Sequence, residues 1–126
     1  MDIEWMMNNS ENKPISKELN QYQTIPLIID VIIKQVDPQK IILFGSCAKR
    51  YISKNSDIDL CVVIDEIQSP KHKRKMKISL LEKLLQITEH EVDILICSKE
   101  EWEKNHKDKS TFIGKIAGEG ELIYGR

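Results

Sequence analysis

The sequence predicts one domain of the α/β (α+β) class, a small sheet packed against helices. Three short apolar runs, bounded by turn-forming or acidic residues, have the length and composition of buried strands. The longer segments between them repeat apolar residues at helical spacing. Helices and strands that alternate along a chain fold as a sheet layered against helices. This pattern leaves the order and direction of the strands open.

The chain length and the polarity of its start predict the domain boundaries. A chain of 126 residues buries one core and not two. Residues 1–20 are polar and irregular, so we interpret them as a loosely held N-terminal segment. Residues 21–126 then form the domain.

The first predicted elements run from Thr24 to Tyr51. Thr24 is the expected N-cap of a helix with Pro26 in its first turn, and Asp37-Pro38 ends it. The run Ile41-Ile42-Leu43-Phe44 predicts a strand buried on both faces. Residues 46–51 are long enough for a short helix.

The second half contains two more strands and three more helices. Strands are predicted at 57–64 and 92–96, and Ser69-Pro70 begins the helix between them. Ser98 and Glu101 form a capping box, Ser110 is the expected cap of a last helix, and an apolar tail follows at 122–124. The inner face of the middle helix is predicted to consist of Met76, Leu80, Leu81, Leu84, Leu85 and Ile87.

Composition narrows the class of protein. The net charge of −1 gives no global attraction to nucleic acid or membrane, so direct nucleic-acid binding is not expected. The basic cluster 71–77 is interpreted as a solvated helix start, with an RNA or acidic-partner contact as the alternative. No secretory signal or run of about 20 apolar residues occurs. Three cysteines without a CxxC pair predict buried, reduced thiols in a cytoplasmic protein.

Gly45-Ser46 follows a predicted strand and begins a predicted helix. The start of a helix presents unpaired N–H groups and the positive end of the helix dipole, which suits a phosphate. Glycine permits close approach of the phosphate to the backbone, and the Ser46 hydroxyl adds a donor. A Gly-Ser turn alone more often only connects a strand to a helix and binds no ligand.

Three acids stand at strand starts. Asp57 and Asp59 are two residues apart, so a strand places both carboxylates on one face. Asp93 begins the next apolar strand in the same way. Carboxylates this crowded oppose one another's ionisation unless a cation is present, and Mg²⁺ suits such a set. The alternative is that Asp57 and Asp59 are solvated acids at an exposed strand end and that Asp93 caps the end of its strand.

Gly-Ser, ten further residues, Asp-x-Asp and a third Asp on the next strand together resemble the signature of the polymerase-β-type nucleotidyltransferase superfamily. Residues 41–64 carry the match closely, and residues 90–97 supply the third acid. A chain this short resembles the minimal nucleotidyltransferase (MNT) group, whose members pair with HEPN-domain toxins in toxin–antitoxin systems. The resemblance implies the polymerase-β-like fold, with a small mixed sheet packed against helices.

The resemblance also implies the chemistry. It implies transfer of AMP from ATP, a nucleoside triphosphate, to a hydroxyl, expected to be a tyrosine of a HEPN partner, by a type VII-like antitoxin. Asp57, Asp59 and Asp93 are then the catalytic residues and the ligands of two Mg²⁺ ions. Gly45, Ser46 and Lys49 bind the nucleotide.

The turn departs from the family pattern Gly-Ser-Arg-Ala-Arg-Gly. Cys47 replaces an arginine, Lys49 lacks the bidentate fork of arginine, and Arg50 replaces a permissive glycine. Two alternatives to the active enzyme therefore stay open. One is a catalytically weak binding module that neutralises a partner by occlusion. The other is transfer to a small molecule such as an antibiotic.

Overall fold

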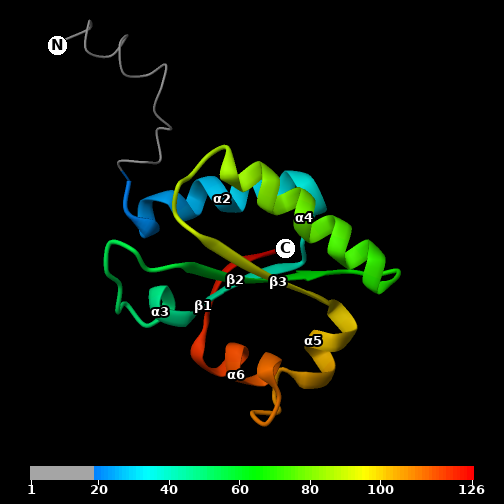
Figure 1. Cartoon of the computed structure of the whole chain (residues 1–126). Helices are drawn as coiled ribbons and strands as arrows, with labels where there is room; N and C mark the ends of the chain where they lie inside the picture. Colours follow the sequence, from blue (N-terminus) through cyan, green and yellow to red (C-terminus); the bar gives the residue numbers. More distant parts are fainter. Residues whose placement is uncertain (1–18) are drawn as a thin grey trace, which may run out of the picture.

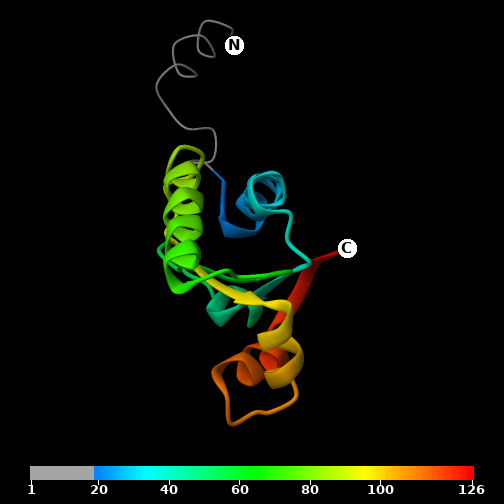
Figure 2. The ribbon, with the colours of Figure 1, turned by 90° about the vertical axis from the view of Figure 1, so that its right-hand side faces the viewer.

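The computed structural model describes residues 19–126, which form a four-stranded sheet with helices on both faces (Figure 1). The elements in chain order are α2 (Gln21–Val36), β1 (Lys40–Phe44), α3 (Gly45–Ala48), β2 (Ile58–Ile64), α4 (Pro70–Leu85), β3 (Val92–Ser98), α5 (Lys99–Asn105), α6 (Phe112–Glu119) and β4 (Glu121–Gly125). Helices α2 and α4 cover one face of the sheet, and α5 and α6 lie on the other (Figure 2).

The sheet is mixed, with strand order β3-β2-β1-β4. Strands β2 and β3 are parallel, whereas β1 is antiparallel to both β2 and β4. The predicted fold class is therefore confirmed. The sequence predicts 122–124 only as an apolar tail, but Glu121–Gly125 pairs with β1 as an edge strand. Three apolar residues after two glycines are too few to indicate a strand without their partner.

The larger core lies between the sheet and helices α2 and α4. Alternate residues of β2 point into it, on the opposite face of the strand from Asp59. A smaller core under α5 and α6 takes the opposite face, so β1 and β2 are buried on both sides as predicted for β1. The buried members of the larger core include Ile28, Ile32, Ile41, Leu43, Ile58, Leu60, Val62, Leu80, Leu84 and Ile96.

Two helix starts differ from the prediction. Helix α2 begins four residues earlier than expected, because Asn20 and Gln23 form a capping box and Thr24 lies inside the helix. Helix α6 is capped by Thr111, whose hydroxyl accepts from the N–H of Gly114, and not by Ser110. In both places several polar residues compete for the cap, and tertiary packing selects one of them. The caps at Ser69 and Ser98 are as predicted.

One residue assigned to the inner face of α4 lies outside it. Leu85 is 77% exposed, although Leu80 and Leu84 on the same helix are buried. Helical periodicity assigns both Leu85 and Ile87 to the apolar stripe, but α4 ends at Leu85. Ile87 lies beyond the helix and still packs against the larger core, whereas Leu85 does not. Leu85 is therefore an exposed apolar side chain at the end of α4.

The three cysteines are free thiols and all are buried, as predicted. In the described part of the chain, we find no helix with the length and apolarity to span a membrane. The predicted N-terminal segment lies outside the described residues except for Leu19 and Asn20.

Candidate active site

Asp59 and Gly45 face each other across the first two strands. Asp59 on β2 is the register partner of Phe44, the last residue of β1, so its carboxylate lies beside the turn that begins at Gly45. Gly45 has φ +72°, a conformation that glycine adopts without steric cost. A Cβ at this position would overlap Oδ2 of Asp59. Glycine at position 45 thus serves both the turn and the close approach of the carboxylate.

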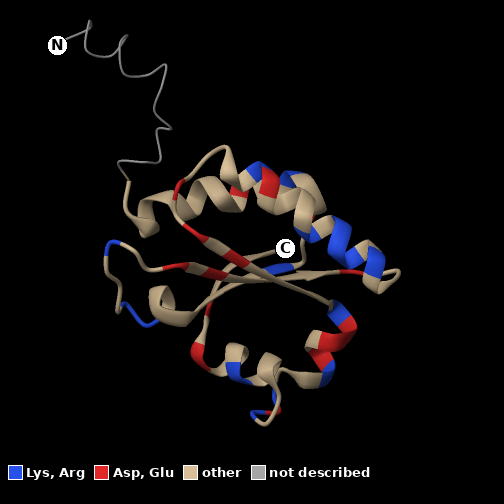
Figure 3. Cartoon of the chain, in the orientation of Figure 1, with Lys and Arg blue, Asp and Glu red and all other residues tan. Residues whose placement is uncertain are grey.

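Asp93 lies beside Asp59 on the neighbouring parallel strand, where the two residues are register partners. Burial, followed by the charges of Asp93 and Asp57 and a hydrogen bond to the Asp93 side chain, raises the pKa of Asp59 to about 6. The acidic stretches of β2 and β3 run side by side at this end of the sheet (Figure 3). Crowded acids hold a proton in this way when no cation offsets their charge.

Asp57 comes one residue before β2 and is half-buried, so the strand begins later than predicted. Its negative charge contributes to the raised pKa of Asp59. Its backbone carbonyl accepts a hydrogen bond from the Cys47 thiol at 3.3 Å, which joins the loop to helix α3. The structure therefore brings the three predicted acids to one end of β2 and β3.

The acids are close, but they do not form a ready coordination shell. Within residues 19–126, no group of three or more His, Cys, Asp or Glu side chains is arranged to hold a metal ion. The donor set nevertheless fits Mg²⁺, which takes one or two carboxylates together with water and substrate phosphates. Binding the ion requires the hydrogen bond between Asp59 and Asp93 to be exchanged for metal contacts.

The helix that begins at the Gly-Ser turn is shorter than predicted. Helix α3 ends at Ala48, and Tyr51 lies beyond it. Ser46 is half-buried at its start, whereas Cys47 is fully buried in the core, where burial raises the pKa of its thiol. Position 47 thus faces the interior. Its departure from arginine therefore changes core packing and does not remove a charge beside the phosphate position.

The two cations of the turn have acidic partners at the end of α6 and the start of β4. Lys49 Nζ lies 3.4 Å from Glu119, and Arg50 donates to Glu121 at 2.9 Å. Arg50 has φ +61°, a left-handed conformation that favours glycine, and its guanidinium stacks over the ring of Tyr22. A phosphate at this turn has to compete with Glu119 for Lys49.

Sequence reasoning missed two residues of α2 that position the site. The buried Gln21 amide donates to the carbonyls of Ser53 and Ser56 at 3.0 and 2.9 Å, which fixes the loop before Asp57. The Tyr22 hydroxyl donates to the carbonyl of Cys47 at 2.9 Å. Neither residue belongs to a motif, and their only signal is a polar side chain at the start of an amphipathic helix.

A family model described as Polymerase beta, Nucleotidyltransferase matches residues 27–126. The chain belongs to this family. The resemblance drawn from the Gly-Ser turn and the three acids is therefore confirmed, and this nucleotidyltransferase domain spans most of the chain. No curated protein matches the sequence.

Solved structures share the fold of this nucleotidyltransferase. One from Sulfolobus solfataricus, itself proposed to be a nucleotidyltransferase, has TM-score 0.56 and 15% identity, with 82% of this chain and 79% of that chain covered. A toxin–antitoxin crystallised with AMP-PNP has TM-score 0.51 and 20% identity, with 79% and 71% covered. A mutant of the toxin–antitoxin MntA–HpeT has TM-score 0.50 and 18% identity, with 80% and 72% covered.

Proposed function

We propose that this chain is an Mg²⁺-dependent nucleotidyltransferase that transfers AMP from ATP to a hydroxyl of a protein partner. The observation that carries the proposal is the packing of Asp59 against Gly45, with Asp93 beside it as its register partner on β3. This arrangement places a carboxylate cluster next to a backbone turn suited to phosphate. A cation between the two would offset both the acids and the triphosphate.

Each residue then has a definite task in the transfer. The oxygen of the acceptor hydroxyl forms a bond to the α-phosphorus, the bond from that phosphorus to the bridging oxygen breaks, and pyrophosphate leaves. Asp93 accepts the hydroxyl proton. Gly45 and Ser46 bind the β- and γ-phosphates with Lys49. Asp57, Asp59 and Asp93 would hold two Mg²⁺ ions, which would supply charge stabilisation during the transfer.

The acceptor that we propose is a tyrosine of a HEPN-domain toxin, which makes this chain the antitoxin of the minimal nucleotidyltransferase (MNT) type in a cytoplasmic pair. Two matched structures of this fold are toxin–antitoxins, and one of them was crystallised with AMP-PNP, an ATP analogue. Residues 21–126 form the transferase domain in this proposal.

Calorimetry with ATP tests the nucleotide site directly. We expect binding in Mg²⁺ that is lost in EDTA and in the Asp57→Asn/Asp59→Asn double variant. In parallel, mass spectrometry of a co-expressed HEPN protein is expected to show added AMP with the wild type only. A wild type that binds no ATP in Mg²⁺, alone or with that protein, would contradict the enzyme.

The ion pairs of the turn favour one second candidate, a module that neutralises its partner by occlusion. Lys49 and Arg50 already contact acids of their own chain, so the turn has fewer charges to offer a triphosphate. The same double variant separates the two functions. If Asp57→Asn/Asp59→Asn still neutralises the partner toxin in cells as well as the wild type does, occlusion is sufficient and transfer is not required.

A further inference from the structure

A groove lies beside the candidate catalytic acid, at the outer edge of the sheet. Its volume is about 320 Å³, and it runs between the end of α4 and the start of β3. Strand β3 is an edge strand, and its outer side pairs with no other strand of residues 19–126. The residues that line the groove are Leu81, Leu84, Leu85, Glu89, His90, Glu91, Val92 and Asp93.

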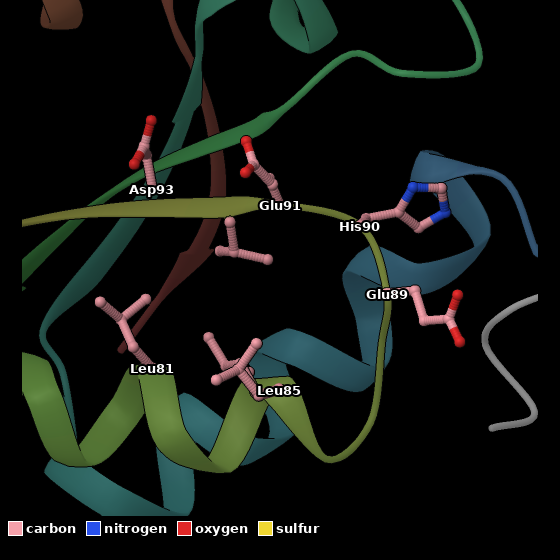
Figure 4. A pocket seen from close by; sticks show the side chains of 8 residues that line it. Leu81, Leu85, Glu89, His90, Glu91 and Asp93 are labelled. Carbon is pink, nitrogen blue, oxygen red and sulfur yellow. The ribbon is translucent and has the colours of Figure 1, made fainter.

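The groove has two chemically different sides (Figure 4). On one side of β3, Leu81 and Leu85 lie together in Figure 4. Val92 also lines the groove and packs against the larger core, and we call these three residues the leucine side. On the other side, Glu91 and Asp93 point away from the leucines, and we call this the acid side. The alternation of side chains along β3 produces the division, because consecutive residues of a strand point to opposite faces.

The leucine side is exposed where a core residue was predicted. Leu85 is 77% exposed, and it lies beside the partly buried Leu81 and Val92. A single exposed leucine needs no explanation, but an apolar patch inside a concave surface next to a catalytic residue is typical of a binding site. The groove also lies at the small end of ligand-site volumes, which favours amino-acid side chains over a large free ligand.

We propose that this groove is the acceptor site and that it binds an extended segment of the partner protein along the outer edge of β3. The inference rests on the proposed function. An extended segment at this edge alternates its own side chains in the same way as β3. A hydroxyl residue that faces Asp93 therefore places its neighbours on the leucine side. Glu91 and Asp93 favour a segment with basic residues.

The site thus selects its acceptor by chemistry: a hydroxyl residue flanked by bulky apolar residues, within a basic stretch. The apolar neighbour supplies binding energy, and the acid side orients the hydroxyl toward the catalytic carboxylate. A small-molecule acceptor uses neither the strand edge nor the alternation. The groove therefore favours a protein acceptor.

Labelled AMP transfer from ATP to synthetic peptides, with the full chain and Mg²⁺, tests the proposal. The first peptide has a central tyrosine flanked by leucines, with lysines at both ends. In the second peptide glycines replace the leucines, and in the third glutamates replace the lysines. The enzyme variant is Leu85→Ser, which removes an exposed apolar side chain of the groove. Its control is Ile78→Ser, because Ile78 is 50% exposed on the same helix and does not line the groove.

We expect Leu85→Ser to lower kcat/KM for the leucine-flanked peptide about tenfold, through KM and not kcat. The glycine-flanked peptide should be a poorer substrate and should not distinguish the variant from the wild type. The glutamate-ended peptide should be poorer than the lysine-ended one. Ile78→Ser should match the wild type with every peptide.

Calorimetry with Mg²⁺ and ATP on the same samples separates this inference from the proposed function. If ATP binds but no peptide is labelled, or Leu85→Ser equals the wild type on all peptides, the groove is not the acceptor site while the nucleotide site stands. Equal losses in Leu85→Ser and Ile78→Ser also overturn the inference. If ATP does not bind at all, the proposed function fails and the groove inference fails with it.

Discussion

The acid cluster and the Gly-Ser turn are neighbours, but their charges are balanced in different ways. In the cluster, Asp59 retains its proton to a higher pH because it is partly buried and its neighbours Asp93 and Asp57 are also acids. At the turn, Lys49 and Arg50 contact acids of their own chain. The first region gains stability from an added cation, whereas the second has to release internal ion pairs before it binds an anion. The Mg²⁺–ATP complex that we propose would supply the cation to the acids and the anion to the turn together.

Gly45 joins the two regions, so its substitution should break both. In Gly45→Ala the new Cβ overlaps the Asp59 carboxylate and the residue has to hold a positive φ. We expect the free energy of unfolding to fall by about 2 kcal/mol. Transfer of AMP should fall with it, because Asp59 has to move. Thermal and urea unfolding measure the first effect, and labelled transfer measures the second.

Gly118→Ala is the matched control for that experiment. Gly118 lies in helix α6, where an added Cβ meets only Lys109 Cε at the ordinary distance of 3.7 Å. Alanine in a helix interior should stabilise by about 0.5–1 kcal/mol. If Gly45→Ala is as stable and as active as Gly118→Ala, then the turn does not pack against Asp59 as closely as the structure indicates.

Asp59→Asn should remove the electrostatic repulsion within the acid cluster. The native pKa of Asp59 is raised from 3.8 to about 6, so the folded state binds more protons than the unfolded state between these values. Below about pH 4 the Asp59 carboxyl does not destabilise the folded state. As the pH rises to about 6, it lowers the free energy of unfolding by a growing amount. The full shift corresponds to about 3 kcal/mol, and solvent screening of this half-exposed group reduces it to about 1 kcal/mol.

The free energy of unfolding, measured without Mg²⁺ at two pH values, tests whether Asp59 destabilises the folded protein near neutral pH. Asp59→Asn should be about 1 kcal/mol more stable than the wild type at pH 7.5 and equal to it at pH 3.5. Asp30→Asn, which changes an exposed carboxyl paired with Lys34, should stay within about 0.5 kcal/mol at both. Added Mg²⁺ should stabilise the wild type and not Asp59→Asn. A variant less stable than the wild type at pH 7.5 would show that the cluster is not strained.

The acid cluster was predictable from the sequence because strand periodicity determines it. Asp57 and Asp59 precede or begin a continuous apolar run, and Asp93 begins another, so their position at one end of the sheet follows once β2 and β3 pair in parallel. The resemblance implied only a small mixed sheet, so the parallel pairing of β2 and β3 became known from the structure. The strand-edge groove was not predictable, because periodicity assigned Leu85 to the core and the end of a helix is poorly determined by local sequence.

The turn was predictable in position but not in its contacts. Gly45 and Ser46 mark it, yet the partners of Lys49 and Arg50 lie some 70 residues later, at Glu119 and Glu121. Gln21 likewise holds carbonyls more than 30 residues away. Long-range contacts of polar side chains leave no periodic signal, so tertiary structure alone reveals them.

The smallest expected effect concerns these ion pairs. In Glu119→Gln/Glu121→Gln, Lys49 and Arg50 lose their acidic partners and become available to a triphosphate. Exposed ion pairs contribute about 0.2–1 kcal/mol, so the affinity for Mg²⁺–ATP should rise about two- to fivefold. Glu100→Gln/Glu103→Gln on α5 changes the net charge equally and should have a smaller effect. The gain should shrink at high salt. An unchanged affinity would mean that Lys49 and Arg50 do not contact the nucleotide, and that triphosphate binding rests on Gly45, Ser46 and the metal ions.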